Sequence, residues 1–320
     1  MVRSYLFGGA LAAALGLVCS PATALSNRAW VSGHGSDVTS CGAPAPPCRT
    51  LQYVHDNILA PGGEIDVLDP AGYGPVTIAK AISIVNDGVG TAGVQQTTSG
   101  ASAITINAGS SDAVTLRGLN VDGLGSAANG ITFNSGGSLT VVNCVIRHFQ
   151  KANSNFLTGN GIVIQPASGP ISVVVSNVIA SDNANAGILY YAVNGSPNVS
   201  GVLDHVAAFN NYVGIDLEFG GATGGNPTFA LSNDVASNNS YGIIVDANAS
   251  VDSTTITSNG QNGLSVGGTV LLSRSFIAWN GVDGVDIVSP GVAYSYGDNR
   301  INANGSKDVN GTLNTSDKPQ

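Results

Sequence analysis

The sequence predicts an all-β protein whose chain winds into a solenoid of parallel strands. Between residues 183 and 287, a pattern of Asn, three residues, Gly and a short apolar run occurs five times. The runs are rich in Val, Ile and Leu and show no helical periodicity. Each unit is too short to hold a crossover helix, which excludes an ordinary βαβ fold. The pairs are Asn183/Gly187, Asn210/Gly214, Asn238/Gly242, Asn259/Gly263 and Asn280/Gly284.

The length of the repeat fits a stack of coils. Subtracting the positions of the five glycines gives spacings of 27, 28, 21 and 21 residues, and weaker copies begin at Gly130 and Gly161. In such proteins each strand pairs with its equivalent one turn away, about 4.8 Å along the axis. We therefore expect the repeated Asn to stack as an amide ladder, and the Gly to serve a positive φ or a close approach of coils. Ordinary turns would explain one or two copies, not five at a fixed offset.

Residues 1–24 read as a secretory signal peptide. Arg3 supplies the positive start, residues 6–18 the apolar core, and Ala22-Thr23-Ala24 the cleavage site. The apolar run is too short to span a bilayer, and no other stretch is a transmembrane segment. We expect a protein that is secreted, either periplasmic or extracellular, after cleavage near Ala24.

Residues 25–48 form an N-terminal extension that we expect to hold a disulfide. Cys41 and Cys48 bound a short Pro-rich loop, and export permits disulfide formation. A metal site is disfavoured because the loop offers two thiols and no nearby His pair. Cys144 lies in an apolar run and is expected to be a buried free thiol.

The next segment begins the solenoid. Residues 50–59 read as one amphipathic helix, with Leu51, Val54 and Ile58 on a common face. A solenoid needs its first coil covered, and this helix can do so. Strands are expected at 63–68, 76–78 and 81–85.

These residues carry a family resemblance. Arg49-Thr50-Leu51-Gln52, Gly63-Glu64-Ile65-Asp66-Val67, Gly72-Tyr73-Gly74-Pro75-Val76 and Lys80-Ala81-Ile82-Ser83-Ile84 resemble the opening of pectin-lyase-like proteins. With the Asn/Gly coils, the resemblance covers residues 49–305 and leaves 306–320 as a C-terminal tail. It implies a right-handed parallel β-helix with an N-terminal capping helix. That fold hosts lyases, hydrolases, epimerases, phage tailspikes and adhesins, so it does not define the function.

Composition excludes one class of partner. Charged residues make up 10% of the chain and the formal net charge is −9. A surface poor in Lys and Arg argues against nucleic acid, because phosphate binding needs basic residues. It also disfavours tight binding of polyanions such as pectate, unless Ca²⁺ bridges them.

A polar stripe marks the candidate site. Counted from each Gly, positions +1 and +3 are mostly apolar and should face the core, so +2 and +4 should face solvent. Stacking the coils then aligns Gln165, Tyr191, Glu218 and Asp246, with Asp216 beside Glu218. Long Gly-, Ser- and Asn-rich loops follow three of these strands and could wall a groove.

The stripe suggests sugar chemistry. Asp216, Glu218 and Asp246 should repel one another, which would raise the pKa of at least one and suit a general acid. The same three carboxylates could instead hold Ca²⁺, although no cofactor is required. Gln165 and Tyr191 would bind substrate. The competing interpretation is that these acids are ordinary solvated surface.

Known catalytic motifs are incomplete in this sequence. Residues 280–286 are similar to the Asn-Thr-Asp-Gly motif of polygalacturonases, but the remaining motifs of that family do not follow. The Asp283/Asp286 match is therefore interpreted as an accident of the repeat. Pectate lyases would need a basic residue facing the site, and Arg117, Arg147, Lys151 and Arg274 lie outside the stripe.

Two functions remain open. The first is an exported β-helix that binds or processes a polysaccharide or cell-surface glycan on one sheet face; as an enzyme it would be a polysaccharide lyase or glycoside hydrolase. The second is a non-catalytic adhesive or structural β-helix. A monomer is expected in either case.

Overall fold

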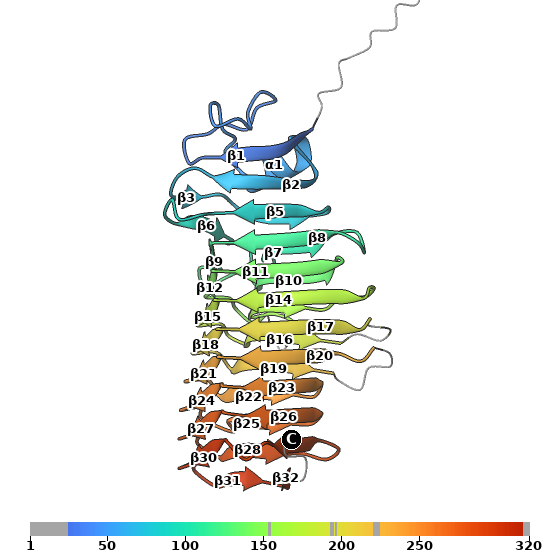
Figure 1. The fold of residues 1–320 in the computed structure, drawn as a ribbon. Coiled ribbons are helices and arrows are strands. Elements are labelled where there is room, and N and C mark those ends of the chain that lie inside the picture. The colour runs from blue at the N-terminus through green and yellow to red at the C-terminus, as the bar shows by residue number, and fades with distance from the viewer. Residues whose placement is uncertain (1–24, 153–154, 193–194, 196, 220–224, 316–320) are drawn as a thin grey trace, which may run out of the picture.

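The computed structural model describes residues 25–152, 155–192, 195, 197–219 and 225–315. The proposed signal peptide lies outside these ranges, as does much of the two loops that follow Tyr191 and Phe219. Within the described residues the chain forms a column of stacked coils built almost entirely from strands (Figure 1). No helix in this part of the chain is long and apolar enough to cross a membrane.

Each complete coil gives one strand to each of three parallel sheets, A, B and C. Sheet A contains twelve strands within the described residues: β1 (Ser26–Val31), β2 (Leu59–Val67), β5 (Ile82–Val85), β8 (Ala113–Arg117), β11 (Ser138–Val142), β14 (Ile171–Ser176), β17 (Val199–Asp204), β20 (Thr228–Ser232), β23 (Asn248–Asp252), β26 (Thr269–Ser273), β29 (Val292–Ser295) and β32 (Leu313–Asn314).

Sheet B is narrow, and sheet C follows it in every coil. The strands of sheet B are β3 (Ala71–Gly72), β6 (Ala92–Gln95), β9 (Leu119–Asp122), β12 (Val145–Arg147), β15 (Ile179–Ser181), β18 (Ala207–Phe209), β21 (Val235–Ser237), β24 (Thr255–Thr257), β27 (Phe276–Ala278) and β30 (Arg300–Asn302). Those of sheet C are β4 (Val76–Ile78), β7 (Ser102–Asn107), β10 (Asn129–Ser135), β13 (Asn160–Ile164), β16 (Ala186–Tyr191), β19 (Val213–Glu218), β22 (Tyr241–Val245), β25 (Leu264–Val266), β28 (Asp283–Ile287) and β31 (Lys307–Asn310).

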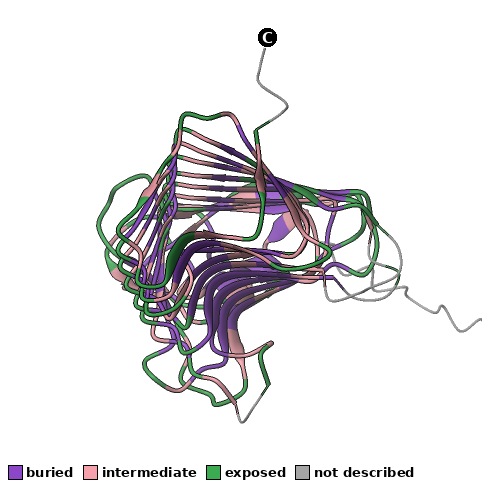
Figure 2. Ribbon diagram, turned by 90° about the horizontal axis from the view of Figure 1, so that it is seen from below, coloured by how far each residue is buried: buried purple, intermediate pink, exposed green. Residues whose placement is uncertain are grey.

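The apolar positions of the repeat fill the interior. Ile188, Ile215 and Ile243 pair in register on neighbouring strands of sheet C, and each is fully buried. Viewed along the axis, the coils superpose and buried residues line the inner side of the sheets (Figure 2). Truncating one such Ile to Ala would cost about 2–5 kcal/mol. The prediction that positions +1 and +3 face the core is confirmed.

One helix closes the N-terminal end. Helix α1 (Leu51–Asn57) starts where Thr50 caps it: the Thr50 hydroxyl accepts a hydrogen bond from the Tyr53 amide. Gln52 reaches from α1 to the exposed edge of sheet C, where its side chain accepts from the Thr77 amide at 2.7 Å and donates to the Thr77 carbonyl. The helix therefore satisfies the strand edge that a first coil would leave open.

Two segments outside residues 49–305 join the stack. Strand β1 lies in the N-terminal extension and pairs in parallel with β2. Strands β31 and β32 lie beyond residue 305 and continue sheets C and A.

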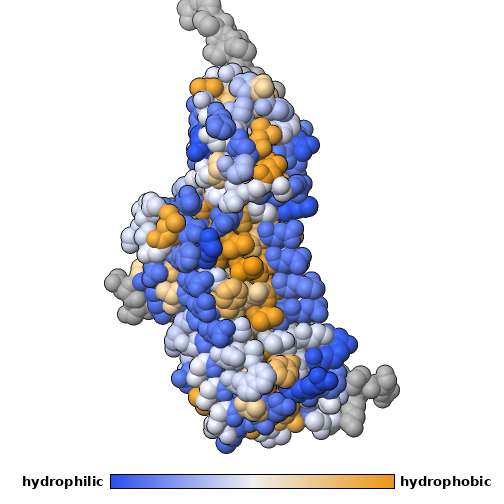
Figure 3. Space-filling model, turned by 90° about the vertical axis from the view of Figure 1, so that its left-hand side faces the viewer, coloured by the Kyte–Doolittle hydropathy of each residue, from blue (hydrophilic) through white to orange (hydrophobic). Residues whose placement is uncertain are grey.

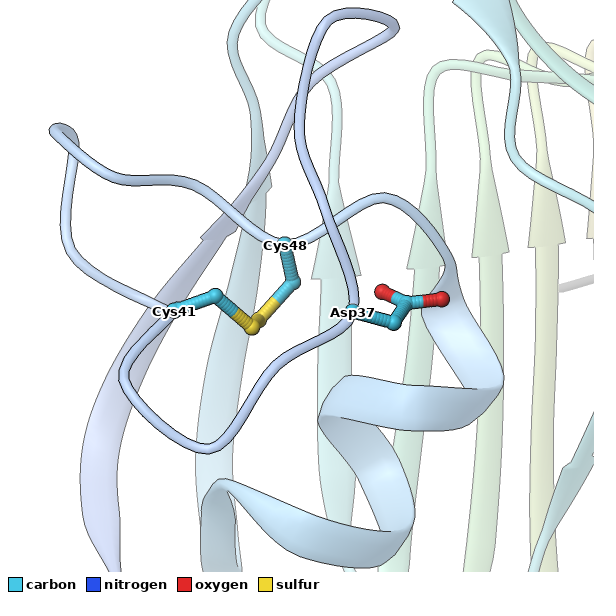
Figure 4. Close-up of side chains that lie close together, drawn as sticks. All are labelled: Asp37, Cys41 and Cys48. Carbon is cyan, nitrogen blue, oxygen red and sulfur yellow. A yellow bond between two sulfur atoms is a disulfide. The ribbon is translucent and has the colours of Figure 1, made fainter.

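The N-terminal extension holds the predicted disulfide. Cys41 and Cys48 are bonded, with Cα atoms 4.9 Å apart (Figure 4). Asp37 lies beside them, and its carboxylate accepts from the amides of Arg49 and Thr50 at 2.8 and 3.1 Å. Asp37 thus fixes the start of α1, and both sulfurs are used in the disulfide, so this cluster is not a metal site. Cys144 is buried and free, as expected.

The predicted asparagine ladder is present, but two of its members differ from the prediction. Side-chain amides bond from coil to coil at 2.9–3.2 Å along Asn183, Asn211, Asn239, Asn259, Asn280 and Asn304. In two coils the ladder residue is therefore Asn211 or Asn239, not Asn210 or Asn238. The latter two precede the ladder, are exposed and have positive φ values of 56° and 55°. Asn is among the few residues that tolerate this conformation.

The repeated glycine serves close approach rather than a positive φ. A Cβ on Gly187 would lie 2.7 Å from the Gly214 carbonyl oxygen, and one on Gly214 would lie 2.6 Å from the Gly242 oxygen. Real Cβ atoms do not come so close to a backbone oxygen, so any larger residue would push the coils apart.

Candidate functional site

The three predicted acids lie together on the outer face of sheet C. Asp216 stands between Leu189 and Ile244 on the neighbouring strands, and Glu218 pairs with Tyr191. Asp246 follows Val245, the register partner of Leu217, so it lies next to Glu218 one coil further on. Neighbouring strands are about 4.8 Å apart, which brings the acids of adjacent coils within range of mutual repulsion.

Apolar side chains cover part of this outer face of sheet C, which the sequence did not predict. Val163 and Leu189 occupy outward +2 positions, yet both are fully buried. They form a small apolar cluster with Ala186 and Val213, and Leu157, Tyr191, Tyr241 and Ile244 pack against it. The expectation that +2 residues face solvent is therefore wrong at Val163 and Leu189, because the segment before β13 folds over them.

Aromatic rings stand around the acids. Phe156 and Tyr191 meet edge to face with ring centroids 5.0 Å apart, and Tyr212 and Tyr241 do the same at 5.7 Å. Such rings offer apolar faces against which a sugar ring can pack, with hydroxyl groups free to donate hydrogen bonds. Tyr212 is 49% exposed, so part of its ring is accessible.

The electrostatics of the cluster favour bound protons. Burial, followed by repulsion from Glu218 and then Asp246, raises the pKa of Asp216 to about 8. Burial and the charge of Asp246 raise the pKa of Glu218, and burial raises that of Asp246. A carboxyl group with a pKa near 8 is largely protonated at neutral pH and can donate a hydrogen bond or a proton.

The acids lie between two hollows on the same face. Towards the N-terminus, a hollow of about 460 Å³ is lined by residues that include Thr77, Thr105, Thr132 and Gln165. Towards the C-terminus, one of about 620 Å³ is lined by residues that include Phe219, Asp246 and Val288. The predicted stripe thus joins the two hollows, because Gln165 lines the first and Asp246 lines the second. We call this path, which is parallel to the axis of the coils, the furrow.

Gln165 and Asp246 are held in place by neighbouring coils. The Gln165 side chain donates to Asn134 at 2.8 Å, and Asn134 donates to Asn107 at 2.9 Å, which makes a second, exposed amide ladder. The Asp246 carboxylate lies over Gly267, where a Cβ would meet its oxygen at 2.2 Å. Gly267 therefore leaves the space that this carboxylate occupies.

The three acids do not form a closed calcium site here. Among the described residues, the one group of three potential ligands with all ligand atoms within 4.8 Å of one another is Asp37, Cys41 and Cys48. The oxygens of Asp216, Glu218 and Asp246 are more widely spread. Ca²⁺ needs six to eight oxygens around one centre, so these carboxylates alone do not fit it.

The polygalacturonase-like segment has a structural role. Asp283 is buried and accepts from the Lys307 amide at 3.0 Å. Asp286 accepts from the side chains of Asn262 and Asn310, both at 2.8 Å. These carboxylates link consecutive coils, in agreement with the interpretation that the motif match is an accident of the repeat.

Sequence reasoning missed Phe156, Leu157, Tyr212 and Tyr241. A signal for the first two was available, because Gly130 and Gly161 are 31 residues apart (161 minus 130), the longest spacing in the glycine series. The extra residues precede β13 and supply the cover. Tyr212 and Tyr241 lie on the N-terminal side of their glycines, and the repeat pattern defines an orientation only for the residues that follow each Gly.

Comparisons with known proteins support the fold. No family model and no curated protein matches the sequence. An alginate lyase from Paenibacillus sp. strain FPU-7 superposes with a TM-score of 0.63 and 15% identity, covering 83% of this chain and 96% of its own. The pectate lyase Pel9A superposes with a TM-score of 0.64 and 16% identity, covering 93% and 82%. The ORF18 protein of Geobacillus virus E2 has a TM-score of 0.53 and 13% identity, covering 86% and 60%. The three parallel sheets and these superpositions show that the chain has a right-handed parallel β-helix fold.

Proposed function

We propose that this protein binds a polysaccharide along the outer face of sheet C, with its centre at Asp216, Glu218 and Asp246. The observation that carries the proposal is the coincidence of three acids, two aromatic pairs and two flanking hollows on one face. Sugar-binding sites combine aromatic faces with polar groups that hydrogen-bond hydroxyls. Tyr191 would contact a sugar ring and Gln165 its hydroxyl groups.

The same acids could process the chain. Asp216 holds its proton at neutral pH and could donate it to a glycosidic oxygen as general acid, while Glu218 or Asp246 would act as the base. The likeness to an alginate lyase and a pectate lyase supports a polysaccharide as the ligand. We propose that no calcium is needed, because the carboxylates do not converge on one point.

Export is part of the proposal. The disulfide between Cys41 and Cys48 is typical of proteins outside the reducing cytosol, and the first residues have the pattern of a signal peptide. A secreted protein of this kind would meet its glycan in the periplasm, at the cell surface or in the medium.

A non-catalytic adhesive β-helix is the second candidate, and one observation favours it. An apolar strip bounded by polar side chains runs along sheet B (Figure 3). Val145, Ile179, Ala207 and Val235 pair in register there, and Ile179 and Val235 are 39% and 38% exposed. A surface of this kind suits attachment more than catalysis.

A glycan-array measurement separates the two candidates. We would compare the protein with the double variant Glu218→Ala/Asp246→Ala, with and without Ca²⁺. The control is Glu64→Ala/Asp87→Ala, which removes the same two residue types far from sheet C. The proposal expects binding that is lost in the first variant only and is independent of Ca²⁺. Absence of binding to every glycan would support the adhesive function, and turnover assays would follow on any glycan that binds.

A further inference from the structure

We infer that the glycan is an uncharged polysaccharide and that its chain extends from the acids towards α1, over the hollow beside Thr105. This inference rests on the proposed function and specifies its substrate class. Three features of the outer face carry it: the distribution of charge, the chemistry of the hollow, and the length of the furrow.

From β4 to β22 the charge on this face has one sign. At the C-terminal end of the sheet, β31 carries Lys307, whose ammonium group donates to the Asn310 side chain at 2.7 Å. The outward side chains of sheet C form two columns along the axis, and within the described residues neither contains Lys or Arg. The first column is Thr77, Thr105, Thr132, Val163, Leu189, Asp216, Ile244, Ser265, Asp286 and Asn310. The second is Asn107, Asn134, Gln165, Tyr191, Glu218, Asp246, Gly267 and Val288.

Another cation, Lys151, lies at the margin of the face. Lys151 places its ammonium group 5.8 Å from the Tyr212 ring and 3.4 Å from the Asn185 side-chain oxygen. These contacts hold the ammonium group beside the turn that precedes β16. A chain carrying a carboxylate on every sugar would find acids and neutral groups along the furrow, and repulsion would oppose its binding.

The hollow beside Thr105 is chemically neutral. Its lining consists of hydroxyl, amide and small apolar groups, and within the described residues it contains no ionisable side chain. Ser102 and Thr132 share a hydrogen bond at 2.8 Å, and Gln96 and Gln52 bond to backbone groups at its edges. The hydroxyls of Thr77 and Thr105 have no side-chain hydrogen-bond partner in this part of the structure, so they remain free to bond sugar hydroxyls.

The furrow is long enough for a chain rather than a single sugar. From β4, which carries Thr77, to β19, which carries Asp216, there are five strand spacings. At about 4.8 Å each, they span roughly 24 Å. Gln52 of α1 closes the N-terminal end of this path. Val163 and Leu189 are covered, so an extended chain would follow the partly exposed column of Asn134, Gln165, Tyr191 and Glu218. Along that column it would contact the neutral hollow and the acids at once.

The test uses oligosaccharides of equal length that differ in charge. Neutral β-glucan, xylan and mannan oligomers would be compared with oligogalacturonate and oligomannuronate by calorimetric titration, at low and high salt. The variant Thr105→Arg fills the hollow and adds a cation. Its control is Thr140→Arg, on the outer face of sheet A at similar burial. Thr105→Val is a milder second variant that removes only the hydroxyl, and circular dichroism confirms that each variant folds.

The inference expects neutral oligomers to bind at least about tenfold more tightly than uronate oligomers at low salt. Thr105→Arg should weaken neutral binding about tenfold and Thr105→Val severalfold, while Thr140→Arg leaves it unchanged. Uronates that bind as well as neutral oligomers would overturn the inference, as would equal effects of the two Arg variants. If no oligomer of either class binds, the proposed function itself fails.

Discussion

Asp234 gives the sharpest test of the physical reasoning, because its carboxyl is buried without a full set of partners. It is 1% exposed, and one oxygen accepts from the Val206 amide at 2.8 Å. The other oxygen has no partner within the described residues. Burial raises the pKa of Asp234 to about 8, so the folded protein keeps this group protonated at neutral pH.

The sign of the pH dependence follows from this shift. The folded-state pKa lies above the ordinary value of 3.8, so the native state binds a proton that the unfolded chain releases. The protonated group gives its full stabilisation below about pH 4. This stabilisation is lost as the pH rises towards 8. At about 1.36 kcal/mol per pH unit, the free energy of unfolding falls by on the order of 4 kcal/mol between pH 4 and pH 7.

Asp234→Asn should remove this loss. Asn299 shows that an amide fits the equivalent position: its oxygen accepts from the Ser275 amide at 2.9 Å, and its nitrogen donates to the Leu272 carbonyl at 2.9 Å. In the coil of Asp234, the corresponding acceptor is the Leu203 carbonyl. The variant should match the wild type near pH 4 and be more stable by several kcal/mol near pH 8.

Urea unfolding followed by circular dichroism at pH 4, 6 and 8 measures the effect. Asp252→Asn is the control, because hydrogen bonds from Arg274 and Ser273 lower the pKa of Asp252. That variant should lose stability at neutral pH and little at acid pH, the opposite trend. A constant destabilisation by Asp234→Asn at every pH would refute the argument, because it would mean that the pKa of Asp234 is the same in the folded and the unfolded protein.

Three further predictions, which use four variants, test the scaffold. Asn239→Ala should lower the unfolding free energy by about 3 kcal/mol, since it leaves the buried Asn211 amide without its acceptor. Asn238 is exposed and lies outside the ladder, so Asn238→Ala should cost about 1 kcal/mol. Equal shifts of the urea midpoints would count against the ladder. Gly214→Ala should cost about 2–3 kcal/mol because its Cβ would strike the Gly242 carbonyl, and a neutral thermal midpoint would show that the coils can separate. Tyr190→Phe should hold or raise stability by up to about 1 kcal/mol, because the buried hydroxyl has no partner within the described residues; a clear loss in the melting temperature would reveal a hidden partner.

The repeat allowed the fold to be predicted because its physical constraints are local and periodic. Each coil must bury the same side chains and satisfy the same turn, so the pattern around Gly187 recurs at Gly214 and Gly242. The ladder residue was misplaced in two coils because Asn210-Asn211 and Asn238-Asn239 are both Asn pairs. Sequence spacing cannot tell which of two adjacent Asn points inward.

The site was only partly predictable, because departures from the repeat create it. Alternation along the strand placed Asp216 and Glu218 on the outer face, and the register aligned Asp246 with them. The cover by Leu157 depends on how an inserted segment folds back on the coils, which no periodicity describes. Burial of this kind is also the largest cause of the raised pKa of Asp216.

Hydrogen bonding distinguishes the scaffold acids from the candidate functional acids better than position does. Asp283 and Asp286 both receive hydrogen bonds from neighbouring coils, and so link the stack. Within the described residues, Asp216 receives none, although it occupies the same outward column as Asp286. Replacing this partly buried acid by Thr or Ser, which stand elsewhere in that column, should raise stability. An acid that costs stability at the centre of a face with aromatic side chains is what a ligand-binding role would require. Loss of glycan binding in Asp216→Ser, with a raised melting temperature, would demonstrate that trade-off.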